Sequence, residues 1–179
     1  MDIPKYARVE IERRALVDPA LCPRLKDEPF DLIEDLYVAR TRLRLRKMTD
    51  AGAAHATYKF CKKYPTPNSM SGLIVNTYLD AAEYAVLRSL PGHEIRKRRY
   101  RILIAGVHFG IDVFQGDLDG LILCEFEAPT LEAARAVGFP RWAPVEVTDD
   151  PFFTGGNLCR IKPEQLLTRL SGIAARLTD

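Results

Sequence analysis

The sequence predicts an α+β protein, mainly antiparallel, built on an eight-stranded β-barrel with flanking helices. Three observations lead to this fold class. Most of the chain divides into short segments in which apolar and polar residues alternate, which is the side-chain period of a β-strand. These segments follow one another through short turns, as antiparallel hairpins do. Charged residues also occupy one face of nearly every segment, which is typical of strands that close around a charged, wet interior.

Length and composition are those of an ordinary globular protein with a sizeable core. The chain has 179 residues, 47% of them hydrophobic, which fits one domain spanning residues 1–179. A net charge of +2 provides no general attraction to nucleic acid or to a membrane. We find no apolar run long enough to cross a bilayer and no signal-peptide pattern, so we expect a cytoplasmic protein. The four cysteines lack a C-x-x-C pair and are expected to be free thiols.

The first half of the chain is predicted to consist of strands. Strands are expected over residues 5–16, 30–48, 55–62 and 72–79, and a turn is expected over residues 49–53. Segment 30–48 is long, and its second half alternates leucines with arginines. Segment 72–79 is the most apolar of the expected strands. Prolines in segments 18–29 and 64–68 mark these as connections.

The second half mixes helices with strands. Asp80 is placed to cap a short helix over 81–89, which Pro91 and the following glycine end. A basic strand over 93–105 is expected to pair with 107–114 as a hairpin, and a further strand covers 121–128. Thr130 is placed to cap a helix over 131–137, residues 139–151 are irregular, and an amphipathic helix covers 163–177. The helices are expected to lie outside the barrel.

Charged residues recur two positions apart on these expected strands. A spacing of two places both side chains on one face of a strand. The residues concerned are Glu10, Glu12, Arg14, Arg44, Arg46, Lys59, Lys97, Arg99, Asp112, Glu125 and Glu127. If these faces converge inside one barrel, they line a pocket with both signs of charge, and such a pocket suits a metal-bound polyanion.

The order of these charged pairs resembles a known family. Glu10-Ile11-Glu12-Arg13-Arg14 is similar to the E-x-E-x-K signature of the CYTH superfamily, also called triphosphate tunnel metalloenzymes. Further similar motifs follow in the family's order: R-x-R at Arg44–Arg46, T-x-K at Thr57–Lys59, K-x-R-Y at Lys97–Tyr100, D-x-F-x-G at Asp112–Gly116 and E-x-E at Glu125–Glu127. The resemblance spans roughly residues 8 to 160.

The resemblance implies a tunnel of eight antiparallel strands and a role for each charged residue. Arg44, Arg46, Lys59, Lys97 and Arg99 would bind the phosphates, and Asp112 would hold a basic residue in place. Glu12, Glu125 and Glu127 would bind one or two divalent metals, Mg²⁺ or Mn²⁺, which prefer carboxylate and phosphate oxygens. Glu10, Glu12 and Arg14 would form the catalytic group, with Glu10 or Glu12 orienting a water molecule.

Two departures from the family pattern bear on the chemistry. Arg14 stands where the first motif has a lysine, which keeps the charge but not the shape. Leu73 and Val75 stand where a further E-x-E is expected, counting back from Lys97 without gaps. These apolar residues weaken the expectation of a second, water-activating metal more than they weaken phosphate binding.

The sequence therefore favours a metal-dependent hydrolase that releases orthophosphate from inorganic triphosphate or a nucleotide. Two alternatives stay open: a non-catalytic module that binds polyphosphate or a nucleotide, and a class IV-type adenylate cyclase. The expected partner is a small-molecule triphosphate. Nucleic acid is not expected, because a strand sends Lys97 and Arg99 to one face and Arg96 and Arg98 to the other. Nothing in the sequence indicates an oligomeric state.

Overall fold

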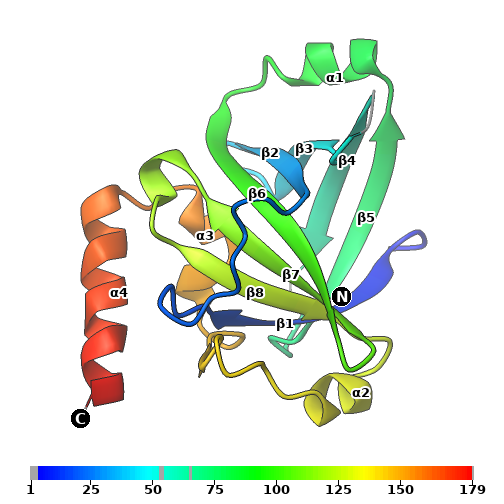
Figure 1. The fold of residues 1–179 in the computed structure, drawn as a ribbon. Coiled ribbons are helices and arrows are strands. Elements are labelled where there is room, and N and C mark those ends of the chain that lie inside the picture. The colour runs from blue at the N-terminus through cyan, green and yellow to red at the C-terminus, as the bar shows by residue number, and fades with distance from the viewer. Residues whose placement is uncertain (1–3, 53–54, 65, 179) are drawn as a thin grey trace.

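The computed structural model describes residues 4–52, 55–64 and 66–178 (Figure 1). Strands dominate, as the alternation of apolar and polar residues predicts. The elements in chain order are β1 (Arg8–Leu16), β2 (Phe30–Val38), β3 (Leu43–Thr49), β4 (Ala56–Tyr64), β5 (Ser71–Leu79), α1 (Ala81–Leu87), β6 (Gly92–Ile104), β7 (Val107–Phe114), η1 (Gly116–Leu118), β8 (Ile122–Glu127), α2 (Leu131–Ala136), β9 (Val145–Glu146), η2 (Pro151–Phe153), α3 (Gly155–Leu158) and α4 (Pro163–Thr178).

Strands β1 to β8 form a closed antiparallel barrel, which confirms the predicted fold class. They follow the order β5-β4-β3-β2-β6-β7-β8-β1, and β1 pairs with β5 to close the circle. The closing seam is short, since it runs only from Arg8 opposite Ile74 to Ile11 opposite Ser71. The remainder of β1 pairs with β8 on one side and with the two-residue β9 on the other. Strand β1 thus joins both ends of the sheet.

The long segment predicted over residues 30–48 is a hairpin rather than one strand. Strands β2 and β3 pair from Leu32 opposite Thr49 to Tyr37 opposite Arg44. The turn between them contains no glycine, and Arg40 adopts a left-handed φ of 58° that non-glycine residues rarely take. The Thr41 hydroxyl supports the turn: it donates to the Val38 carbonyl (2.9 Å) and accepts from the Leu43 amide (3.0 Å). Because this turn contains neither Gly nor Pro, the sequence did not indicate it.

Both predicted helix caps are present. The Asp80 carboxylate accepts from the Glu83 amide (2.8 Å), and the Glu83 side chain accepts from the Asp80 amide (2.9 Å), so α1 begins with a capping box. The Thr130 hydroxyl accepts from the Ala133 amide (3.0 Å) at the start of α2. None of the helices in the described part of the chain is long and apolar enough to cross a membrane.

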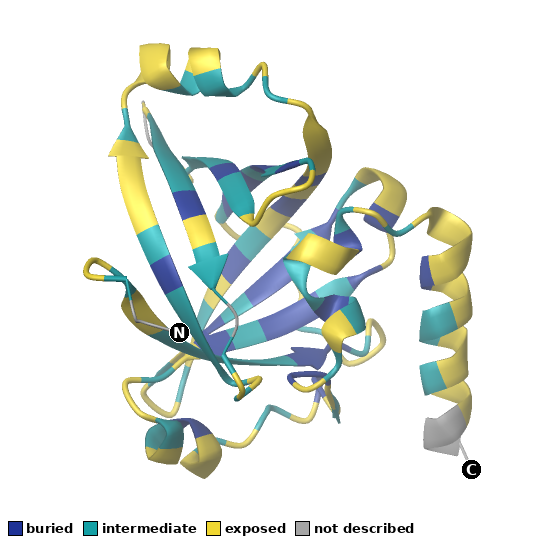
Figure 2. Ribbon diagram, turned by 180° about the vertical axis from the view of Figure 1, so that it is seen from behind, coloured by how far each residue is buried: buried dark blue, intermediate teal, exposed yellow. Residues whose placement is uncertain are grey.

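Apolar residues pack on both faces of the barrel wall. The outer cluster includes Tyr100, Phe109, Ile111 and Phe126, and the segment around Trp142 covers it. Arg13 also points outward: its guanidinium donates to both Glu146 carboxylate oxygens (2.8 and 2.6 Å) and lies over the Phe126 ring. Figure 2 shows that the buried residues concentrate on the strands of this half of the barrel. The outer position of α2 follows from this packing.

The second cluster closes one end of the barrel interior, and we call it the floor. Its members are Leu16, Ile95, Phe114, Leu118, Leu121, Leu123, Val147, Phe153, Leu158 and Leu166, with Tyr37 packed against them. Several come from interior-facing strand positions, for example Leu16 opposite Leu123. Others come from η2, α3 and α4, so these elements fill an end of the barrel. The expectation of an interior that is wet and charged throughout was therefore wrong at this end.

A candidate active site in the barrel interior

The strand register brings the predicted charged residues onto one face of the sheet. Directly opposite residues on antiparallel strands share a face. Asp35 lies opposite Arg46, and Arg46 lies opposite Lys59 on its other side. Three further pairs continue this face around the barrel: Arg99 with Asp112, Arg14 with Glu125, and Glu12 with Glu127. The predicted site residues therefore share the interior face, although they come from six strands.

One side of this interior, on β6, β7, β8 and the end of β1, is a network of ion pairs that we call the paired wall. Asp112 is fully buried and accepts from the ammonium of Lys97 and from two nitrogens of Arg99 (2.6 and 2.5 Å). Arg99 also donates to Glu125 (2.6 Å). Burial lowers the pKa of Lys97, although the charge of Asp112 opposes this shift. Asp112 thus contacts both of the basic residues that follow one another on the interior face of β6, and its supporting role stays a prediction.

Glu125 and Arg14 belong to the same network. Burial alone would raise the pKa of Glu125, but Lys97, Arg99 and Arg14 outweigh it and hold the pKa well below its usual range. The Arg14 guanidinium lies 3.9 Å from Glu125, and it donates to Glu12 (2.5 Å) and to the Phe153 carbonyl of the floor (3.2 Å). Arg14 therefore joins the charged interior to its apolar end.

The opposite side, on β3, β4 and β5, is rich in cations, and we call it the basic wall. Arg46 makes two parallel hydrogen bonds to the buried Asp35 carboxylate of β2, each 2.7 Å long. Arg44 lies 3.7 Å from the same carboxylate and interacts with Tyr37. Although burial opposes ionisation of Asp35, Arg46 and Arg44 hold its pKa well below the usual range. Asp35 orients both arginines, and the sequence analysis did not identify it.

The lysine nearest to the carboxylates of β1 is Lys63, a residue that the sequence analysis missed. Its ammonium lies 2.8 Å from Glu10 and 3.5 Å from Glu12. The predicted Lys59 shares this interior face but lies further along β4, with its ammonium 5.1 Å from the centre of the Tyr78 ring. The period of two could have identified Lys63, because Lys59, Cys61 and Lys63 must share a face. The predicted strand, residues 55–62, ended one residue before Lys63.

Three carboxylates converge near the closing seam. Burial and the negative charges of Glu10 and Glu12 raise the pKa of Glu127. Burial would also raise the pKa of Glu10, but Lys63, Arg44 and Arg46 outweigh it and lower that pKa. A bound cation would reduce the repulsion among these three carboxylates.

The three predicted metal ligands do not form a ready-made site. Glu12 and Glu127 are direct cross-strand partners, whereas Glu125 is engaged by Arg99 and Arg14. Within residues 4–52, 55–64 and 66–178, no three His, Cys, Asp or Glu side chains are arranged to hold an ion. Glu125 therefore belongs to the ion-pair network, and its role as a metal ligand stays a prediction.

The predicted positions for the missing acidic pair on β5 need correction. Asn76 lies opposite Cys61 and Tyr78 opposite Lys59, so the even-numbered residues of β5 face the interior. Leu73 and Val75 belong to the other face. The ungapped count was wrong by one residue, and a shift of one residue exchanges the faces of a strand. The residues in place of acidic ligands are therefore Ile74, Asn76 and Tyr78, which are also uncharged.

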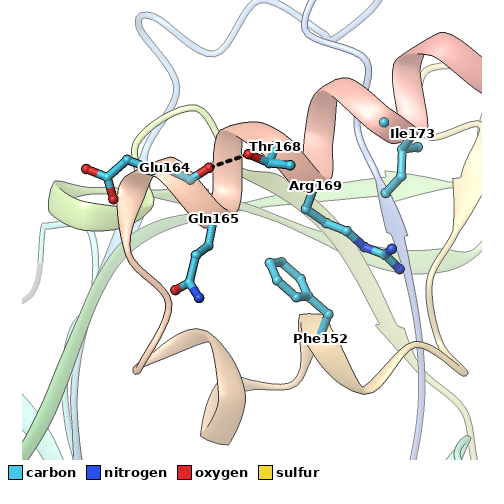
Figure 3. Close-up of a pocket in the computed structure, with 7 residues that line it drawn as sticks. Phe152, Glu164, Gln165, Thr168, Arg169 and Ile173 are labelled. Atoms are coloured by element: carbon cyan, nitrogen blue, oxygen red, sulfur yellow. Dashed lines mark hydrogen bonds between the residues drawn. The ribbon is translucent and has the colours of Figure 1, made fainter.

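Two surface pockets lie outside this interior. Figure 3 shows a pocket of 460 Å³ between η2 and α4, lined by Phe152, Arg169 and Ile173 among others. A neighbouring pocket of 670 Å³ continues past Asp150, which forms an ion pair with Arg169. Both belong to the outer side of the floor, and neither contains a predicted site residue.

A closed eight-stranded antiparallel barrel with interior acidic and basic side chains is the architecture of the CYTH-type, or triphosphate tunnel, proteins, which the motif order predicted. The fold matches the crystal structure of the inorganic triphosphatase NE1496 with a TM-score of 0.57 and 25% sequence identity, over 86% of this chain and 96% of that one. It also matches the PH1819 protein of Pyrococcus horikoshii with a TM-score of 0.52 and 18% identity, over 71% of this chain and 83% of that one. The second match concerns the fold alone.

A curated relative matches a shorter part of the chain at a higher sequence identity. The inorganic triphosphatase of Acetivibrio thermocellus is 35% identical over 66 residues, which are 37% of this chain. The match covers about two fifths (41%) of that relative's length. No family model matches the chain. The barrel and its neighbours confirm the resemblance to the CYTH-type proteins that the sequence motifs indicated.

Proposed function

We propose that this chain is a divalent-metal-dependent hydrolase of a triphosphate-bearing small molecule, inorganic triphosphate or a nucleotide, and that it releases orthophosphate. The observation that carries the proposal is the basic wall, where Arg44, Arg46, Lys59 and Lys63 gather on one interior face. Strands β3 to β5 contribute no carboxylate to that face. The similarity to two inorganic triphosphatases supports the choice of substrate.

The arginines and lysines bind the phosphates in this proposal. Guanidinium groups match phosphate oxygens with two parallel hydrogen bonds, and Asp35 already orients Arg46 by such a pair. Lys97 and Arg99 approach from the paired wall, where Asp112 fixes their side chains. Each contact is strengthened because the interior is partly shielded from water. The phosphate chain would thus contact cations from both walls.

A divalent cation, Mg²⁺ or Mn²⁺, fits the carboxylates beside the seam. The fit rests on the donor set, because Glu12 and Glu127 lie directly opposite each other and Glu10 shares their face of β1. Burial and the charges of Glu10 and Glu12 also raise the pKa of Glu127. Glu12 and Glu127 would hold the ion, and phosphate oxygens would complete its ligand set, since such ions bind few carboxylates together with phosphate. A bound cation would offset the negative charge that develops on the leaving group.

In this proposal Glu10 orients the attacking water. The ammonium of Lys63 keeps its carboxylate ionised, and an ionised carboxylate accepts a hydrogen bond from water. Arg14 holds Glu12 in position from the other side (2.5 Å). Orientation of water together with neutralisation of phosphate charge is the main requirement of phosphoryl transfer.

Release of orthophosphate tests the proposal. Purified protein is incubated with inorganic triphosphate or ATP, each with Mg²⁺, with Mn²⁺ or with a chelator, and phosphate is measured by colourimetry. We expect metal-dependent release from at least one substrate. Micromolar binding without any release would favour the non-catalytic module instead. Chromatography of the ATP reaction would reveal cyclic AMP if the chain were a cyclase.

A further inference from the structure

The outer end of the basic wall carries an aromatic ring and an amide, those of Tyr78 and Asn76. Tyr78 and Asn76 occupy consecutive interior-facing positions of β5. Figure 2 shows exposed residues along this end of the strand, next to α1. The Tyr78 ring is 69% exposed, which is unusual for a tyrosine on the inner face of a closed sheet. Its position demands an explanation beyond packing.

Tyr78 is the end of a row of residues that leads into the interior. Lys59 lies directly opposite it, Arg46 lies opposite Lys59, and Asp35 lies opposite Arg46. The Lys59 ammonium lies 5.1 Å from the centre of the Tyr78 ring. A phosphate chain held by Arg46 and Lys59 would therefore direct whatever it carries toward this ring.

The Asn76 side chain is also available to a ligand. It lies one interior position deeper than Tyr78, opposite Cys61, and is exposed. Among the hydrogen bonds found in the described part of the chain, none uses its amide. A carboxamide can donate and accept at the edge of a nucleobase, and an aromatic ring can stack on the base plane.

We propose that Tyr78 and Asn76 form a nucleobase subsite at the rim of the barrel, so that the preferred substrate is a nucleoside triphosphate. This inference rests on the proposed function of the interior. The shared chemistry is an aromatic heterocycle that carries a triphosphate, which thiamine triphosphate also has. A neutral nucleobase fits better than the cationic thiazolium ring of thiamine, because the Lys59 ammonium lies beside Tyr78.

Substrate selectivity of a Tyr78→Ala variant tests the subsite. Base stacking on an aromatic side chain contributes enough that we expect kcat/KM for ATP to fall about tenfold. The value for inorganic triphosphate should change much less, because that substrate has no base. Tyr78→Phe should retain the ATP value, and Asn76→Ala should reduce it by a smaller factor than Tyr78→Ala.

Tyr6 provides a matched control. It is 76% exposed and has a lysine ammonium, that of Lys5, 5.5 Å from its ring centre, but it precedes β1 and lies outside the sheet. Tyr6→Ala should leave both substrates unaffected. Equal losses for ATP and inorganic triphosphate in Tyr78→Ala, or no loss for either, would overturn the subsite. A wild-type preference for thiamine triphosphate over ATP would overturn the nucleotide assignment.

The outcome can be separated from failure of the proposed function. If the wild-type protein turns over no triphosphate, calorimetric titration with ATP and with inorganic triphosphate still measures the contribution of the base. Tighter ATP binding that Tyr78→Ala removes would support the subsite without any catalysis. Turnover of inorganic triphosphate with no Tyr78-dependent advantage for ATP would reject the subsite and leave the proposed function intact.

Discussion

The two walls of the barrel interior carry similar residues but differ in how their charges are satisfied. On the paired wall, Lys97 and Arg99 share the buried Asp112, and Arg99 also binds Glu125. On the basic wall, Arg44 and Arg46 share Asp35 and Lys63 pairs with Glu10, while Lys59 has a tyrosine ring as its neighbour. Buried charges without partners are strongly unfavourable, so the ion pairs of the paired wall stabilise the fold and hold Lys97 and Arg99 in place. The basic wall retains cationic capacity for a ligand.

The largest expected effect is the loss of stability in Asp112→Ala. This change would leave Lys97 and Arg99 without their shared partner at a fully buried position. Removing one member of a buried ion pair costs about 3–5 kcal/mol, and we expect a loss of that size in the free energy of unfolding by urea titration. As a control, Glu94→Ala breaks the exposed pair with Arg88, which should cost about 1 kcal/mol or less. Equal losses in the two variants would contradict the distinction between the walls.

The next effect concerns the carboxylate beside the seam. Glu127→Gln should reduce metal-dependent turnover about a hundredfold or more, because a metal ligand is lost. Phosphate release at saturating Mg²⁺ measures this effect. Activity that is unchanged would remove Glu127 from the metal site.

The same variant should be slightly more stable than wild type without metal. The pKa of Glu127 is raised in the folded protein, so its protonated form contributes stability below the ordinary value of 4.5. That contribution is lost as the pH rises through the raised pKa, where the carboxylate is repelled by Glu10 and Glu12. With chelator present, the melting temperature of Glu127→Gln should exceed that of wild type at pH 8 and equal it near pH 4. The opposite order at pH 8 would contradict the repulsion.

The smallest effect distinguishes the two lysines of β4. Lys63→Met should reduce kcat about tenfold, since it removes the cation that keeps Glu10 ionised, whereas Lys59→Met should alter kcat less. The pKa of Glu10 is lowered mainly by Lys63 against its burial. The acidic limb of the pH–rate profile should therefore move to higher pH in Lys63→Met only. A larger loss of kcat in Lys59→Met, or a shift of its acidic limb, would instead assign this role to Lys59, the lysine of the T-x-K motif.

Period-two reasoning predicted which residues of a strand share a face, and the register bears this out. It succeeded for pairs such as Glu10 with Glu12 and Arg44 with Arg46, because a strand offers only two faces. Pairing between distant segments then brought these faces together, as motif order implied. The fold class was predictable for the same reason, since seven or eight alternating segments in hairpin order have few closed arrangements.

What the sequence could not provide was set by irregular segments and by side-chain contacts. The turn at Arg40 depends on a strained backbone and one threonine hydroxyl, so two strands were predicted as one. The ungapped count pointed to Leu73 and Val75 because no sequence pattern fixes the number of residues in a connection. Partners of buried charges depend on strand register: Asp35 lies opposite Arg46 on the β2–β3 pair, and Lys63 reaches Glu10 past β5, which lies between β4 and β1. Part of the floor, namely Val147, Phe153 and Leu158, comes from a segment that has no clear period before α4.

The apolar floor affects how a ligand could enter and leave the barrel. Phe153 and Leu158 fill one end of the barrel, and Arg14 binds the Phe153 carbonyl beneath the charged residues. This end of the barrel is thus packed with apolar side chains. In the proposed reaction, the substrate and both products would pass through the end of the barrel opposite the floor, so slow release of one product would obstruct the next substrate.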